Sequence, residues 1–166
     1  YGNAPFVASF FLRSHAAEVA DVARAVSDAL GLDLKPVGLL GIVIGLMSGI
    51  SGALGFWLGG VIADFIGKGN LTRYMHFSAI AAALTVPPAL GLLTVSSIGP
   101  AMVMLALHGF FGGLHYGPTY SIAYSVVPPH MRATTSALLL FVVDLLALGL
   151  GPLAVGLLSD VFGATA

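Results

Sequence analysis

The residues best suited to proton or solute chemistry are polar side chains set within long apolar stretches. Asp144 is the single charged residue in the stretch 133–158. At about 1.5 Å per helical residue, it would lie roughly 16 Å along that stretch, near the middle of a ~30 Å bilayer core. A carboxylate at that depth costs about 2.5–3.5 kcal/mol and should face a cavity or a partner, where its protonated form could carry a proton. The alternative is that Asp144 is a protonated or hydrogen-bonded structural residue.

Histidines and tyrosines cluster in a second apolar stretch, residues 99–127. His108 and His115 are two helical turns apart and therefore share a face, and His115 could form a proton or substrate site with Asp144. The neighbouring stripe of Tyr116, Tyr120 and Tyr124 could bind a headgroup or stack on an amphipathic ligand. The alternative is that these tyrosines hydrogen-bond to neighbouring helices.

Arg13 follows the first apolar stretch and could attract an anionic solute, or it could anchor the chain at the membrane interface. The sequence has no His-x-x-x-His spacing, no paired carboxylates and no serine elbow. We therefore expect no catalytic residues, no metal and no cofactor, and we do not expect an enzyme.

The composition is that of a membrane protein. Hydrophobic residues make up 58% and charged residues 8% of the chain, with a mean hydropathy of +1.01. Soluble domains carry about 25% charged residues, and a soluble chain so poor in charge would expose large apolar patches. The net charge of −1 gives no basic surface, so we expect no nucleic-acid partner. The absence of cysteine excludes disulfides.

The charge-free stretches predict helices long enough to cross a bilayer, which takes about 20 residues. Residues 1–12 reach about half that length and are interpreted as the end of a truncated helix. Residues 13–36 alternate apolar and charged residues at helical spacing, with Ser14 as the expected N-cap and Gly31 as the C-terminal stop. This segment is expected to be an amphipathic helix on the membrane face, or else a small solvated loop helix. Four full spans are expected, at residues 37–63, 74–95, 99–127 and 133–158.

The basic residues predict the orientation. Lys68, Arg73 and Arg132 lie in loops 64–73 and 128–132, which we therefore expect to be cytoplasmic. The segment 13–36 is then an extracytoplasmic loop.

Glycines and prolines predict how the spans pack. Pro87 and Pro88 interrupt the second span, because each removes a backbone donor. A stripe of glycines along the first full span predicts close packing of another helix, either static or sliding. Its members are Gly38, Gly41, Gly45, Gly49, Gly52, Gly55 and Gly59.

One motif occurs twice with identical spacing. Gly60-x-x-x-Asp64-x-x-Gly67 is followed by Lys68, and the same spacing returns further along the chain. Three expected crossings separate the two copies, so they should face opposite sides of the membrane, as in the inverted repeats of secondary transporters. The second copy comprises Gly156, Asp160 and Gly163.

These residues carry a resemblance to a known family. "GGVIADFIGKG" resembles the loop signature of the major facilitator superfamily, although Ile62 and Phe65 depart from it and Lys68 alone remains of the final basic pair. "VPPHMRATTSALLLFVVDLLALGLGPLAVGLLSD" resembles the spinster-like members. The resemblance implies an all-α polytopic protein, with residues 37–163 forming helices 8 to 11 of the C-terminal six-helix bundle. Residues 1–12 would end helix 7, and residues 164–166 would lead into a missing last helix.

The family resemblance also implies a function. Such proteins are secondary active transporters, symporters or antiporters, that work by alternating access, and spinster-like members are linked to lipid-like or organic-anion solutes. The implied partners are an N-terminal six-helix half, the lipid bilayer, a small-molecule substrate and protons. The implied location is a bacterial inner membrane. Proton transfer by Asp144 is not itself implied, because spinster-like relatives are expected to carry an amide there.

The resemblance assigns the motif residues to a conformational gate. Asp64 would dock on a helix of the opposite half, and Arg132 would assist the equivalent contact. The alternatives are that Asp64 and Asp160 are plain helix caps at the membrane interface. For the whole chain, the alternative is a non-transporting membrane assembly module, or an inactive remnant, that associates through its glycine stripe.

Overall fold

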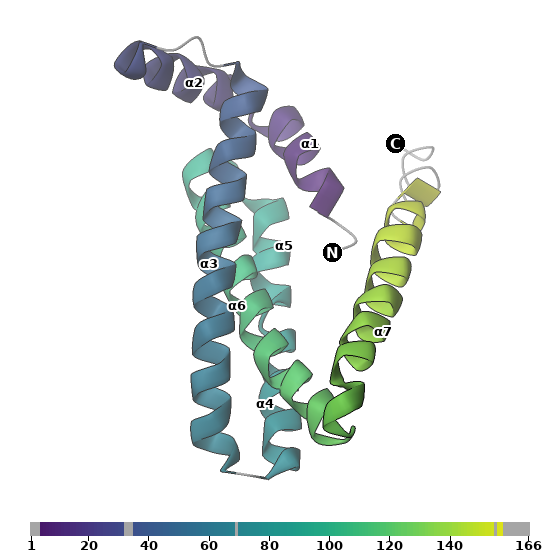
Figure 1. Cartoon of the computed structure of the whole chain (residues 1–166). Coiled ribbons are helices and arrows are strands. Elements are labelled where there is room, and N and C mark those ends of the chain that lie inside the picture. Colours follow the sequence, from purple (N-terminus) through teal and green to yellow (C-terminus); the bar gives the residue numbers. More distant parts are fainter. Residues whose placement is uncertain (1–3, 32–34, 69, 155, 158–166) are drawn as a thin grey trace.

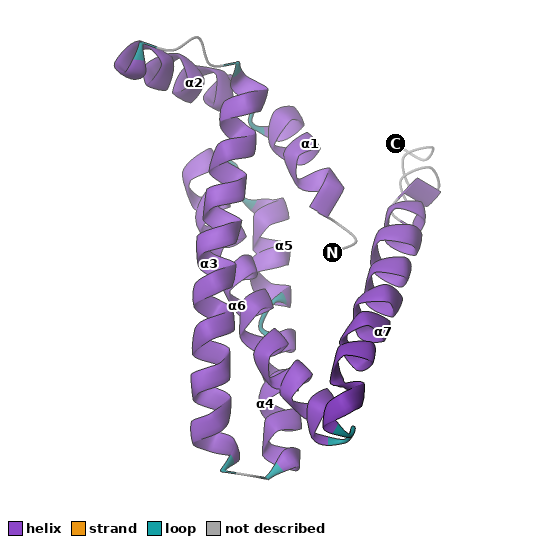
Figure 2. Cartoon of the chain, in the orientation of Figure 1, coloured by secondary structure: helices purple, strands orange, loops and turns teal. Residues whose placement is uncertain are grey.

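The computed structural model describes residues 4–31, 35–68, 70–154 and 156–157. These residues form helices and short connections, and none of them is in a strand (Figure 2). The helices are α1 (Ala4–Ser14), α2 (Ala16–Leu30), α3 (Pro36–Gly67), α4 (Leu71–Ala83), α5 (Val86–Thr94), α6 (Ile98–Ser125), the short η1 (Pro129–Met131), α7 (Arg132–Asp144) and η2 (Leu145–Leu150).

Among the described residues, four helical segments are long and apolar enough to cross a membrane. They confirm the expected all-α polytopic class, and the chain is an integral membrane protein. At about 1.5 Å per residue, the 32 residues of α3 reach roughly 48 Å, which exceeds a ~30 Å apolar core. The four segments are Pro36–Gly67, Leu71–Thr94, Ile98–Ser125 and Pro129–Ala154.

The helices α3 and α6 form the centre of a bundle, and α4 and α5 pack against α6 (Figure 1). The amphipathic α2 runs across one end of α3, with α1 beside it. The last helix, α7, leans away from the bundle and is joined to α6 at the opposite end, where Tyr124 and Ser136 share a hydrogen bond of 2.6 Å.

The interruption expected at Pro87 and Pro88 is confirmed. The second span consists of α4, which ends at Ala83, and α5, which begins at Val86. Both prolines lie in the first turn of α5, where a missing N–H donor is tolerated. The break leaves the backbone around Thr85 accessible to a neighbouring helix.

The amphipathic helix forms as expected, with one correction at its start. Gly31 adopts the left-handed conformation (φ 62°) and its N–H donates to the carbonyl of Ser27, which confirms it as the C-terminal stop. The predicted N-cap is wrong, because α1 continues through Ser14 and His15 caps α2 without a side-chain hydrogen bond. Along α2, Val19 is buried and Asp21 is exposed, as the pattern predicts.

The glycine stripe of α3 is a packing surface along its second half. A Cβ at Gly55 would overlap the carbonyl of Phe110, and one at Gly59 would overlap the carbonyl of Leu114. The two helix backbones therefore touch, as expected for membrane helices that associate through small residues. In the first half of the stripe, a Cβ at Gly38, Gly41, Gly45 or Gly49 would meet no described atom within 4 Å.

Candidate functional site

A large apolar cavity lies between α1, α3, α5 and α6. Its volume is about 790 Å³, within the range of roughly 300–1,000 Å³ found for small-molecule sites. Among the described residues, its lining holds no Asp, Glu, Lys or Arg. The lining residues are Phe6, Val7 and Phe10 of α1; Ser48 and Gly52 of α3; Ala89, Leu90, Leu92 and Leu93 of α5; and Leu105, His108, Gly109, Gly112, Gly113 and Tyr116 of α6.

Glycines of α6 have two roles at the cavity: one leaves open space in it, and another allows close packing of α6 on α3. A Cβ at Gly113 would overlap the carbonyl of Gly52, so this residue fixes α6 against α3. Gly112 differs, because a Cβ there would meet nothing within 4 Å. The open space beside Gly112 belongs to the cavity, since Gly112 lines it.

His108 is the titratable imidazole in the cavity wall. Its Nδ1 lies 3.1 Å from the carbonyl oxygen of Thr85, at the break between α4 and α5. Since a carbonyl oxygen only accepts, Nδ1 is the donor and Nε2 is left as the acceptor of the neutral ring. The proline break thus orients one of the predicted site residues.

The structure separates three of the other predicted ligand residues from this cavity, namely His115, Tyr120 and Arg13. Tyr116 lines it and stacks on His115 at 4.5 Å between ring centroids, but His115 and Tyr120 are not among the lining residues. The carbonyl of His115 accepts a hydrogen bond from Ser78 of α4 at 3.2 Å. Arg13 is exposed in the last turn of α1, outside the lining.

Asp144 is half-buried and lies where α7 passes into the π-helix η2. It makes no hydrogen bond or ion pair with any residue that the structure describes, and it is not joined to His115. Short π-helical segments are frequent at functional sites. A proton site shared by Asp144 and His115 therefore stays a prediction.

The motif that the resemblance assigns to a gate lies at the corner between α3 and α4. Asp64 accepts a hydrogen bond of 2.6 Å from the hydroxyl of Tyr74, in the first turn of α4. Gly67 lies against the Tyr74 ring, which a Cβ would overlap. Lys68 ends α3 in the left-handed conformation (φ 41°), and its Nζ lies 5.7 Å from the centroid of the Phe65 ring. Tyr74 is not part of the sequence motif and was missed as a partner of Asp64. Its position shortly after the loop, in the first turn of the next helix, is the signal that could have identified it.

The remaining gate residues are less constrained. Arg132 is exposed as the first residue of α7. A Cβ at Gly156 or Gly60 would meet nothing within 4 Å. Asp160 and Gly163 lie outside the described residues. Among the residues that the structure does describe, no cluster of three His, Asp or Glu side chains could hold a metal ion.

We expect Tyr74→Phe to loosen the 64–73 loop, because it removes the hydroxyl that donates to Asp64. Tryptic cleavage after Lys68 in inside-out vesicles should become roughly threefold to tenfold faster, as the loss of one such bond implies. Tyr124→Phe removes a tyrosine hydroxyl from the junction between α6 and α7 and should leave that rate unchanged. Equal rates for Tyr74→Phe and the unmodified protein would show that this bond does not hold the loop.

The fold and cavity define an α-helical, multi-pass membrane protein with an apolar site between its helices. Over 125 residues the chain is 30% identical to an MFS-type efflux pump of Mycolicibacterium smegmatis, and the match covers 75% of this chain and 29% of that protein. This similarity supports membership in the major facilitator superfamily. The match spans under a third of the length of that relative. No family model matches the chain, and no solved structure matches it significantly.

Proposed function

We propose that this chain is part of a secondary active transporter that works by alternating access and moves an amphipathic, lipid-like solute. The observation that carries the proposal is the apolar cavity of about 790 Å³ with His108 and Tyr116 in its wall. The similarity to an efflux pump supports a transport role. The protein would act in a bacterial inner membrane together with a second six-helix half.

The cavity favours an amphipathic cargo over a strongly anionic one. A buried carboxylate or phosphate of a ligand needs a cationic partner, and the described part of the lining offers neither Lys nor Arg. The imidazole of His108 can accept a hydrogen bond at Nε2, which suits a hydroxyl, amide or ammonium group. Apolar parts of the solute would contact Phe6, Phe10 and the leucines of α5.

We further propose that the 60–68 motif is a gate, with loops 64–73 and 128–132 on the cytoplasmic side. The bond between Tyr74 and Asp64 supports a rigid corner that could dock on the opposite half. The sequence "VPPHMRATTSALLLFVVDLL" supports a spinster-like subtype by resemblance. A second role, as an assembly module, is favoured by one observation: a Cβ added at Gly38, Gly41, Gly45 or Gly49 would meet no described atom within 4 Å, which leaves that surface open to another helix.

Counterflow with the full-length protein in liposomes tests the proposed function. We expect saturable exchange of a zwitterionic amphipathic dye and at least tenfold slower exchange of citrate, because the lining that the structure describes has no Lys or Arg. Exchange of neither solute, combined with a stable oligomer that Gly45→Leu disrupts, would favour the assembly module.

Asp144→Asn tests proton coupling separately from transport. An amide cannot carry a proton, so accumulation driven by a pH gradient should fall to the equilibrium ratio while counterflow continues. Asp21→Asn, on the exposed face of α2, should change neither measurement. If Asp144→Asn still accumulates solute in response to the pH gradient as the unmodified protein does, Asp144 is excluded as the proton carrier.

A further inference from the structure

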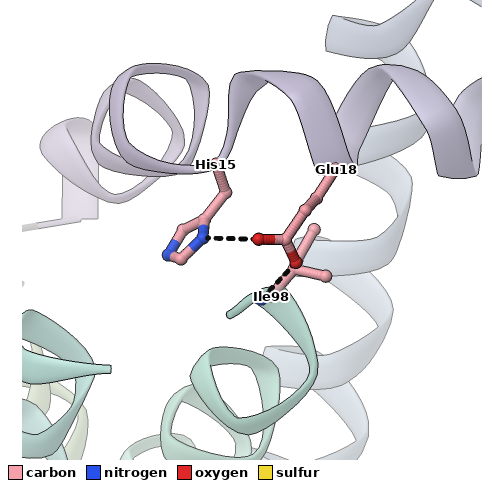
Figure 3. A network of polar contacts seen from close by, with 3 residues as sticks. All are labelled: His15, Glu18 and Ile98. Atoms are coloured by element: carbon pink, nitrogen blue, oxygen red, sulfur yellow. Dashed lines mark hydrogen bonds and ion pairs between the residues drawn. The ribbon is translucent and has the colours of Figure 1, made fainter. Parts of the chain in front are cut away.

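A buried histidine and a glutamate meet where α1 passes into α2 (Figure 3). The His15 side chain is 1% exposed and packs against the rings of Phe10 and Phe11, at 6.1 and 5.7 Å between centroids. Neither ring nitrogen has a hydrogen-bond partner, although Nδ1 lies 3.6 Å from Oε1 of Glu18. Buried polar atoms are almost always paired, so this unsatisfied imidazole calls for an explanation.

The second oxygen of Glu18 reaches a different helix. Oε2 accepts a hydrogen bond of 2.7 Å from the backbone N–H of Ile98, the first residue of α6. The helix's own N-cap, Ser97, provides no side-chain hydrogen bond. Glu18 therefore satisfies a free N–H at the positive end of α6 from an element that is distant in the sequence. By helical spacing alone, Glu18 belongs with the charged residues on the solvated face of α2.

We propose that His15 and Glu18 form a proton-binding clamp that ties α1 and α2 to the start of α6. A protonated imidazole has two N–H donors and a positive charge, and Glu18 presents one oxygen to His15 and the other to Ile98. Protonation thus adds a charged hydrogen bond without displacing the existing one. Protonation of His15 therefore closes the clamp, and loss of that proton loosens it.

No other charged group competes for this site among the described residues. The exposed Asp21 and Arg24 of α2 pair with each other. Arg13 of α1 and Lys35 at the start of α3 are both exposed. The segment α5 carries no ionisable residue, α3 carries Asp64 near its far end, and the nearest such residue of α6 is His108, about 15 Å along the helix.

Apolar packing around the clamp is incomplete, so the attachment of α2 to α6 depends largely on polar contacts. An apolar cavity of about 180 Å³ separates parts of α2, α3 and the first turn of α6, with Val22, Leu39 and Ile98 in its wall. An incompletely filled junction gains less from dispersion contacts than a packed one. The hydrogen bonds through Glu18 should therefore decide how firmly α2 is held to α6.

The clamp would act on the large cavity, a consequence that rests on the proposed function. Phe6, Val7 and Phe10 of α1 face His108 and Leu105 of α6 across that cavity. Closing the clamp holds α1 against α6. In an acidic extracytoplasmic medium the cavity should therefore open less readily toward that side.

Hydrogen exchange of the Ile98 amide tests the clamp in the full-length protein in lipid nanodiscs. After correction for intrinsic exchange, we expect protection at pH 5.5 to exceed that at pH 7.5 by about tenfold, the size of one added charged hydrogen bond. His15→Gln should abolish this difference, because glutamine cannot gain a proton. Glu18→Gln should also abolish it while keeping an acceptor for Ile98.

The control is His130→Gln, which alters an exposed histidine of η1 at the other end of the bundle and should leave the pH difference intact. The proposal is overturned if protection is the same at both pH values, or if the difference persists in His15→Gln and Glu18→Gln. Exchange requires no transport, so its result separates the two proposals. Counterflow without the pH difference would reject the clamp alone, and the pH difference without counterflow would reject the transport role alone.

Discussion

Gly112→Phe in the full-length protein should weaken binding and counterflow of an amphipathic solute by at least tenfold. Gly112 lines the large cavity, and a side chain there starts in open space. An aromatic ring would enter the volume that the solute occupies without forcing α6 away from α3. Overfilling a packed site costs about 1–3 kcal/mol, and about 1.4 kcal/mol corresponds to a factor of ten in affinity.

Two variants control for effects on folding. Gly112→Ala adds one methyl group and should lower affinity only slightly. Gly45→Phe places the same ring on α3. A Cβ at Gly45 also meets no described atom within 4 Å, but Gly45 does not line the cavity. Affinity in Gly112→Phe equal to that of the unmodified protein would remove the cavity as the binding site.

Gly55→Ala should destabilise the bundle by about 1–3 kcal/mol or more, the range for overpacking. The new Cβ would overlap the carbonyl carbon and oxygen of Phe110, which are backbone atoms and cannot rotate away. The helices α3 and α6 would have to separate along their closest contact. The measurement is the midpoint of unfolding in mixed micelles, which should fall clearly.

Gly49→Ala is the matched control, because it lies on the same helix with no described atom within 4 Å. Alanine is favoured over glycine in a helix by up to about 1 kcal/mol, so this change should be neutral or stabilising. Opposite signs for the two variants would establish the contact. Equal midpoints would mean that α3 and α6 do not pack through this glycine.

The spans were predictable because their cause is local. Uninterrupted apolar residues require a helix in lipid, and Pro87 and Pro88 cannot continue the helix that precedes them. Gly31 ends α2 as expected, because the left-handed conformation of a helix stop is also a local preference of glycine. The N-cap was wrong because α1 runs on through Ser14, so the boundary depends on how two short helices meet.

The site was predictable only in part because its geometry depends on packing between distant segments. His108 and Tyr116 were recognised as polar residues in an apolar helix, but the tie of His108 to the carbonyl of Thr85 follows from the position of a proline break in another span. Glu18 fits a solvated helix face by spacing, and its contact with Ile98 becomes evident only once α2 crosses the end of α6. The position of Asp144 relative to His115 depends likewise on how α7 packs.

Photolabelling of the full-length protein with a photoreactive amphipathic probe is the most direct test that the cavity binds the transported solute. If it does, the labelled peptides should come from residues 6–10 of α1 and 105–116 of α6, and an excess of unlabelled solute should suppress the labelling. Labelling confined to the exposed outer faces of α3 and α7, and unaffected by solute, would contradict the proposed site.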